Sequence, residues 1–181
     1  MKNFKVVESN IVFKGKVFDV KMDTIEYNGT GNLAPKQVAV HPGGAVVLPV
    51  TKENKIIFVT QYRYPHDQII YELPAGKLEK GEDPLVCATR ELKEETGFTS
   101  ENITKLGKIF TTPGFCDEVL HLYLAENLIE GEHAREEGEE GMELHELTIS
   151  EVEEKILTGE IVDAKSICGI MMFKLNKERR M

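Results

Sequence analysis

The sequence is poor in cysteine and has no long apolar segment. Its three cysteines, Cys87, Cys116 and Cys168, lie far apart and form no CxxC pair. We therefore expect free thiols in a reducing cytoplasm rather than a disulfide framework. No apolar run approaches the ~20 residues that a membrane-spanning helix requires. The opening MKNFKVVESN lacks the apolar core of a signal peptide. These absences predict a cytoplasmic protein that does not bind a membrane.

Positive charge is also in short supply. Lys and Arg number 22 against 31 Asp and Glu, and the formal net charge is −9. This balance argues against a nucleic-acid partner. An anionic substrate would be repelled as well, unless a bound metal ion supplied positive charge. With 181 residues, of which 41% are hydrophobic, the chain is long enough for one domain with a proper core.

Alternating apolar and polar residues predict a small antiparallel β element at residues 1–41. Segments 4–9 and 10–27 alternate in this way, and a third strand is expected at 36–41 after an Asn28-Gly29 turn. One short sheet cannot bury all the apolar side chains of this element. We therefore predict that it packs against a second subunit in a homodimer, and that residues 42–181 form the main domain.

The main domain mixes strands with helices. Strands are expected at 45–50, 55–61, 69–76, 103–110, 119–125 and 142–147, and helices at 84–96, 151–157 and 164–176. Thr148 or Ser150 is expected to cap the second helix, with Glu153 near the position of a capping box. The Glu-rich segment 131–141 predicts a mobile loop. Together these elements predict an α/β (α+β) fold.

The first of these helices has well-marked ends and two different faces. Asp83-Pro84 is a helix start, and Gly97 suits the left-handed residue just past a helix end. An apolar stripe should dock on the core, and it consists of Leu85, Ala88 and Leu92.

Three glutamates crowd another side of the same helix, namely Glu91, Glu94 and Glu95. Like charges on one turn repel one another, whereas hard divalent cations bind carboxylate oxygens in such an arrangement. Arg90 can hold one carboxylate by a forked hydrogen bond, and Glu82 can fold back on the cluster. The alternative is a solvated, charged helix face, as is usual for charge runs.

The whole segment resembles the box of the Nudix hydrolases. Its residues are Gly76, Glu82, Arg90-Glu91-Leu92, Glu94-Glu95 and Gly97-Phe98, at the spacings of that box. The resemblance implies an α/β/α Nudix sandwich and a Mg²⁺ cofactor, for which Mn²⁺ can substitute. It also implies a role for each charged residue. Glu91 and Glu95 are the leading metal ligands, Glu94 is the next, the carbonyl of Ala75 is a further candidate, and Arg90 orients the cluster.

Segments outside the box are similar to the ADP-ribose pyrophosphatase group. They are HPGGAVVLPV, QYRYP, YELPAGKLEKGE, Pro113 within TTPGFCDE, and DAKSI. The resemblance implies metal-dependent hydrolysis of ADP-ribose to AMP and ribose 5-phosphate. It also implies that Glu118 is a catalytic base or additional metal ligand, with Asp117 as its rival.

Substrate contacts are assigned to four residues, and they are Arg63, Phe18, Lys36 and Pro113. Arg63 is a candidate to hold a phosphate or the terminal ribose, or else it packs between Tyr62 and Tyr64. Phe18 is the candidate platform for adenine. Members of the group often have an Arg-Glu pair where this chain has Lys36-Gln37. This difference leaves the substrate less certain than the reaction.

Three alternatives stay open at this point. The first is a Nudix hydrolase of a sugar nucleotide, a dinucleoside polyphosphate or an oxidised nucleotide. The second is a domain that only senses a nucleotide, although such domains typically lose box glutamates that are all present here. The third is an acidic scaffold that recruits a basic partner through residues 130–146. Metal-dependent turnover separates the enzymes from the other two.

Overall fold

The structure is a computed structural model that describes residues 2–132, 134 and 141–180. The mobile loop predicted at 131–141 falls mostly outside these ranges. The chain divides into two compact units. The first contains the residues up to Gly43 together with Phe110–Val119, and the second contains Gly44–Ile109 and the residues from Leu120 onward.

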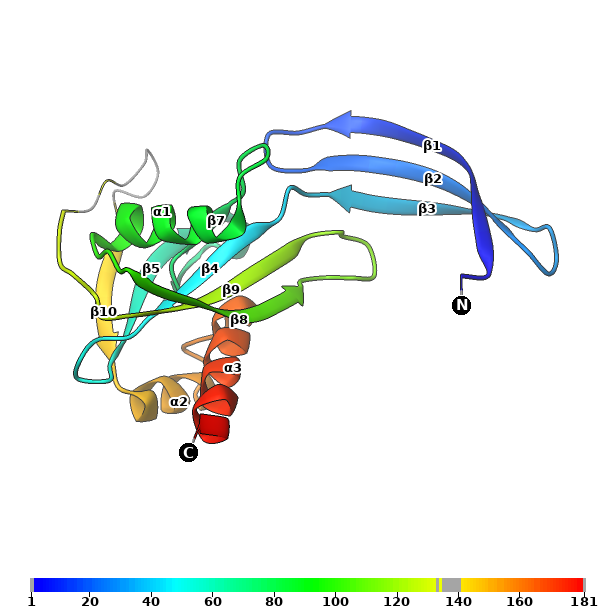
Figure 1. The fold of residues 1–181 in the computed structure, drawn as a ribbon. Helices are drawn as coiled ribbons and strands as arrows, with labels where there is room; N and C mark the ends of the chain where they lie inside the picture. Colours follow the sequence, from blue (N-terminus) through cyan, green and yellow to red (C-terminus); the bar gives the residue numbers. More distant parts are fainter. Residues whose placement is uncertain (1, 133, 135–140, 181) are drawn as a thin grey trace. The chain divides into compact units, whose positions relative to one another are not determined.

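The first unit is an antiparallel meander of β1 (Phe4–Lys14), β2 (Asp19–Tyr27) and β3 (Leu33–Val40) (Figure 1). Every strand pairs with its neighbour in sequence, from Phe4 opposite Tyr27 to Asp19 opposite Val40. Many of its apolar side chains are exposed, among them Val12, Phe13, Val17 and Leu33. The meander and its surplus of exposed apolar residues match the sequence prediction, except that β3 begins earlier than expected.

The second unit contains two sheets. One has the strand order β7 (Ala75–Lys77), β4 (Gly44–Pro49), β9 (Val119–Glu126) and β8 (Asn102–Phe110). Strands β4 and β9 are parallel, with Gly44 opposite Leu120. The other sheet has the order β10 (Glu143–Leu147), β5 (Ile56–Arg63) and β6 (Gln68–Glu72).

Helices cover both faces of the four-stranded sheet (Figure 1). Helix α1 (Pro84–Thr96) lies on one face, and α3 (Ala164–Arg180) packs on the other. Successive side chains of strand β4 point alternately to the α1 face and to the α3 face of this sheet. Ala45 and Val47 join a cluster with Leu92 of α1, while Val46 and Leu48 join the cluster that contains Ile170 of α3. This is an α/β/α sandwich, which confirms the predicted fold class.

The predicted helix ends are correct for α1. Asp83 Oδ1 accepts from Leu85 N at 2.8 Å, and Gly97 has a φ of 79°. Helix α2 (Ile149–Leu157) is capped by Thr148 in a full capping box with Glu151. The alternative cap, Ser150 with Glu153, is therefore wrong.

Two further sequence predictions are wrong. The single strand expected at 69–76 is divided into β6 and β7, which belong to different sheets. Pro74 lies at the break, where its missing N–H favours an interruption of strand pairing. Leu85 was expected in the buried stripe but is 40% exposed, because it lies in the first helical turn at the edge of the buried face.

No helix within the described ranges is long and apolar enough to cross a membrane.

Candidate active site

Two of the three glutamates clustered on helix α1 are buried. Glu91 is 6% exposed and Glu95 is 4% exposed, while Glu94 is more accessible. Helix α1 holds their carboxylates against strand β7 and the segment that follows it (together called the β7 loop), where Ala75 N donates to Glu95 Oε2 at 3.3 Å. A Cβ on Gly76 would overlap the Glu91 carboxylate. Glycine at this position therefore lets the backbone lie directly against the glutamate.

Arg90 lies among the carboxylates and offsets their repulsion. Its Nη1 donates to Glu91 Oε1 at 2.6 Å and to Glu94 Oε2 at 2.9 Å. Its Nε and Nη2 donate to the two oxygens of Glu82 at 3.1 and 3.2 Å. Glu82 thus folds back on the cluster as the sequence indicated. The hydrogen bond to Glu82 raises the pKa of Arg90, and the same contact lowers the pKa of Glu82.

Cys87 contacts the backbone of the β7 loop. Its Sγ donates to the carbonyl oxygens of Gly76 and Lys77, both at 3.7 Å. Burial, with the nearby charges of Glu82 and Glu91, raises the pKa of the thiol to about 12. The thiol therefore contacts the backbone at Gly76 and Lys77, and its raised pKa disfavours the thiolate form.

The glutamates Glu91, Glu94 and Glu95 of α1, here called the acid row, have the chemistry that suits a hard divalent cation. It offers buried carboxylate oxygens on one helix face beside the Ala75–Gly76 backbone, and such ions prefer oxygen ligands. Because Gly76 has no side chain, the Glu91 carboxylate can lie against this backbone. Within the described ranges, no three acidic, His or Cys side chains are already arranged around a common point. A cation would therefore take over carboxylates that Arg90 now holds.

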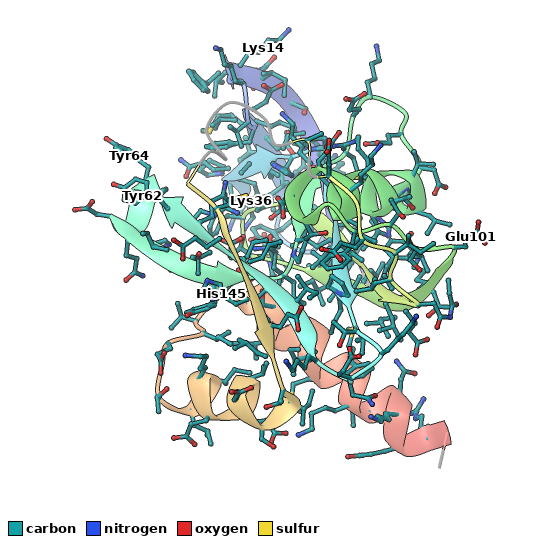
Figure 2. All side chains as sticks on the ribbon, turned by 90° about the vertical axis from the view of Figure 1, so that its left-hand side faces the viewer. Lys14, Lys36, Tyr62, Tyr64, Glu101 and His145 are labelled. Carbon is teal, nitrogen blue, oxygen red and sulfur yellow. The ribbon has the colours of Figure 1, made fainter. Side chains whose placement is uncertain are left out.

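Arg63 lies at the end of β5 and contacts a carboxylate. Its Nε and Nη2 donate to Glu72 at 2.5 and 2.6 Å, and this contact raises the pKa of the guanidinium. Tyr62 and Tyr64 stand at the outer end of the β5–β6 hairpin, 52% and 85% exposed (Figure 2). Arg63 is thus engaged by a carboxylate, a contact that neither sequence-based alternative for this residue included.

The first unit contains a groove of about 560 Å³ between the meander and the loop 110–119. Phe18 and Glu118 both line it, so the structure brings these two predicted residues together. Lys36 and Pro113 do not line it, and Gln37 does. Residues 36 and 37 point to opposite sides of β3 because side chains alternate along a strand.

His41 is a residue that the sequence reasoning missed. Its backbone N–H donates to Asp117 Oδ1 at 2.8 Å, and its Nδ1 lies 3.2 Å from Glu118 Oε1. Asp117 is thereby engaged in holding the loop, while Glu118 faces the groove. In the sequence, the HPGG segment contributed only to the resemblance to the ADP-ribose pyrophosphatase group, and its histidine was assigned no role. The available signal was a histidine followed by a proline and two glycines, which is weak by itself.

Comparison with known proteins agrees with this geometry. The NUDIX domain family matches residues 40–168. The chain is 40% identical over 174 residues to an ADP-ribose pyrophosphatase of Bacillus subtilis (strain 168), covering 96% of this chain and 94% of the relative. It is equally similar, at 40% identity and the same coverage, to a methanol dehydrogenase activator of Bacillus methanolicus. A crystal structure of an ADP compounds hydrolase has the same fold, with a TM-score of 0.87 and 16% identity over 99% of this chain and 97% of that one.

The fold is an α/β/α sandwich, and its helix α1 carries buried glutamates that lie against the Ala75–Gly76 backbone. Together these features indicate a class of metal-dependent hydrolases. The chain belongs to the NUDIX domain family. The family predicted from the Gly76–Phe98 segment is confirmed.

Proposed function

We propose that this chain hydrolyses the diphosphate of ADP-ribose to AMP and ribose 5-phosphate, with Mg²⁺ as cofactor and Mn²⁺ as a substitute. The observation that carries the proposal is the acid row, in which Glu91 and Glu95 are buried against the β7 loop and Arg90 compensates their charge. The 40% identity to an ADP-ribose pyrophosphatase over nearly the whole chain supports the choice of substrate.

The acid row is the proposed cation site. Its ligands would be Glu91, Glu95, Glu94 and the carbonyl of Ala75. A bound divalent cation polarises a phosphate and lowers the pKa of a water ligand. Arg90 orients the carboxylates and limits their mutual repulsion before a cation binds, since it donates to Glu91 and Glu94 together.

Residues of the first unit are proposed to accept the proton of the attacking water and to bind the adenosine part of the substrate. Glu118 stays the proposed acceptor of the proton of the attacking water, because its segment is similar to that of the ADP-ribose pyrophosphatase group, and its rival Asp117 is held by His41 N. Phe18, which lines the groove of this unit, would carry the adenine ring. Lys36 and Pro113 stay as predictions, supported by their sequence position alone.

Phosphate recognition in the second unit is assigned to Arg63. A guanidinium matches phosphate oxygens with a rigid fork of donors. Its side chain is 40% exposed, so that it can reach a ligand while it is held by Glu72.

We further propose that the chain acts as a cytoplasmic homodimer and binds no nucleic acid. The dimer rests on the exposed apolar residues of the β1–β3 meander. The compartment rests on three free cysteines, and the lack of nucleic-acid binding rests on the net charge of −9.

Release of phosphate monoester from ADP-ribose with Mg²⁺ tests the function directly. The assay panel should include sugar nucleotides, dinucleoside polyphosphates and oxidised nucleotides. ADP-ribose should be preferred, EDTA should abolish turnover, and Glu95→Gln should lower kcat/KM at least ~100-fold. Glu101→Gln is the matched control, because Glu101 is an exposed carboxylate on the surface (Figure 2).

The contrary outcomes separate the alternatives. Preference for another compound of the panel keeps the reaction and overturns the substrate. Equal losses in Glu95→Gln and Glu101→Gln overturn the role of the acid row. A wild-type protein that binds ADP-ribose but turns over no compound with Mg²⁺ is a nucleotide sensor.

A further inference from the structure

Glu72 is a buried carboxylate shared by two cations. Its side chain is 3% exposed at the end of β6. Arg63 donates to both of its oxygens, at 2.5 Å to Oε1 and 2.6 Å to Oε2. Lys165 Nζ, from the first turn of α3, also contacts Oε2. Burial raises the pKa of Glu72, but Arg63 and Lys165 outweigh it and lower the pKa below its ordinary value. Glu72 is therefore ionised at neutral pH.

The first turn of α3 holds Lys165 in place. Asp163 Oδ2 accepts from Ser166 N at 3.0 Å, which caps the helix, and from Lys165 Nζ at 3.0 Å. Ser166 is fully buried, and its Oγ accepts from Leu73 N at 2.7 Å. Leu73 directly follows Glu72 in the chain. The ammonium group is thus tied to the backbone beside the carboxylate that it contacts.

Arg63 is more accessible than its partners. Its side chain is 40% exposed, against 13% for Lys165. Within the described ranges, Nη1 of Arg63 makes no hydrogen bond to the protein, so this edge of the guanidinium points to no internal acceptor. A phosphate oxygen that draws Arg63 toward itself weakens the contact with Glu72. Leaving a buried carboxylate without a counter-ion is strongly unfavourable.

We propose that Lys165 is a positioning residue that neutralises Glu72, so that Arg63 can turn donors toward a substrate phosphate without leaving a buried negative charge unpaired. The inference rests on the proposed function, in which Arg63 binds the diphosphate. It assigns the DAKSI segment a role in substrate binding through Arg63, with Asp163 and Ser166 fixing the lysine.

The test measures kcat, KM and melting temperature for ADP-ribose hydrolysis by single and double variants. Lys165→Met should leave Arg63 as the only counter-ion of Glu72, and KM should rise about tenfold while kcat stays within about threefold. Lys165→Arg should restore KM to within about threefold of wild type. The double variant Glu72→Gln/Lys165→Met should have a lower KM than Lys165→Met, because no carboxylate then retains Arg63.

Lys174→Met is the matched control, since Lys174 lies on the same helix and pairs with Glu153 at the surface. A Lys165→Met enzyme with the KM of Lys174→Met, even with a lower melting temperature, overturns the inference and leaves a structural ion pair. A KM higher in the double variant than in Lys165→Met overturns it too. A wild-type enzyme with no turnover on any substrate fails at the proposed function, and the inference falls with it.

Discussion

Gly76 has no room for a side chain as long as Glu91 keeps its position. A Cβ there would overlap the Glu91 carboxylate, whereas a Cβ on Gly29 would meet nothing within 4 Å. Gly76→Ala should displace Glu91 from the β7 loop and lower kcat/KM at least ~100-fold. Gly29→Ala should match wild type in both kcat/KM and melting temperature. Wild-type kinetics in Gly76→Ala would contradict the fit between loop and helix described above.

Glu72 makes stability depend on pH in a defined direction. Its pKa is lowered from an ordinary value of 4.5, so the ionised form is favoured in the folded protein. The stabilisation is complete above that value and is lost as pH falls through 4.5 toward the folded pKa. The unfolding free energy of wild type should therefore approach that of Glu72→Gln as the pH is lowered.

Urea denaturation of both proteins, from about pH 7 to about pH 3.5, measures this difference. The comparison isolates Glu72 because the other titrating groups are common to both chains. A constant difference would mean that burial balances the two cations, and a difference that grows on acidification would mean that burial outweighs them.

At the scale of elements, local signals predicted the ends of helix α1 correctly. They did not predict which sheet a strand joins or which side chains the sheet covers. Asp83-Pro84 and Gly97 fix the ends of α1 through their own backbone chemistry, and both ends are observed. The break between β6 and β7 was missed although Pro74 is visible in the sequence, because a proline can also lie at a strand edge and does not by itself show that the chain changes sheets. The exposure of Leu85 was missed because a helical stripe does not reveal where the covering sheet ends.

Helix α2 offers a clean test of a local signal. Thr148 accepts from Glu151 N, and the Glu151 carboxylate accepts from Thr148 N at 2.7 Å. Thr148→Ala should cost about 1 kcal/mol and lower the melting temperature by roughly 2–4 °C. Ser150→Ala is the control, because this serine was the alternative cap and should change the melting temperature little. A larger loss in Ser150→Ala would reverse the assignment.

At the scale of the molecule, the sequence predicted the acid row with Arg90 and Glu82 beside it, but not the polar contacts between distant segments. The box lies within one loop and helix, so its spacing is visible in the chain. The contact of Glu72 with Lys165 joins segments 93 residues apart, and the loop at His41 is held by Asp117 from 76 residues away. No short pattern encodes such pairs, which depend on how the sheets bring distant segments together.

The exposed apolar side chains of the meander make a prediction about assembly. Val12, Phe13 and Val17 are 59%, 58% and 60% exposed, and covering such residues by a second copy would remove apolar surface from water. Sedimentation at micromolar concentration should give the mass of a dimer, and Phe13→Glu should shift it toward the monomer. Lys14→Glu, a charge change at the next position of β1, is the control. A monomeric wild type would exclude the homodimer.

The parallel pairing of β4 with β9 constrains the order of folding during synthesis. Strand β4 (Gly44–Pro49) is buried along its whole length. Strand β9 (Val119–Glu126), which pairs with all six of its residues, leaves the ribosome much later. Strand β7 arrives sooner but pairs with β4 at only Gly44, Ala45 and Val46. The meander has no such delay, because each of its strands pairs with the next. The nascent chain therefore presents a finished β meander followed by an unpaired apolar strand, and Gly44–Pro49 is the segment that a chaperone would have to shield.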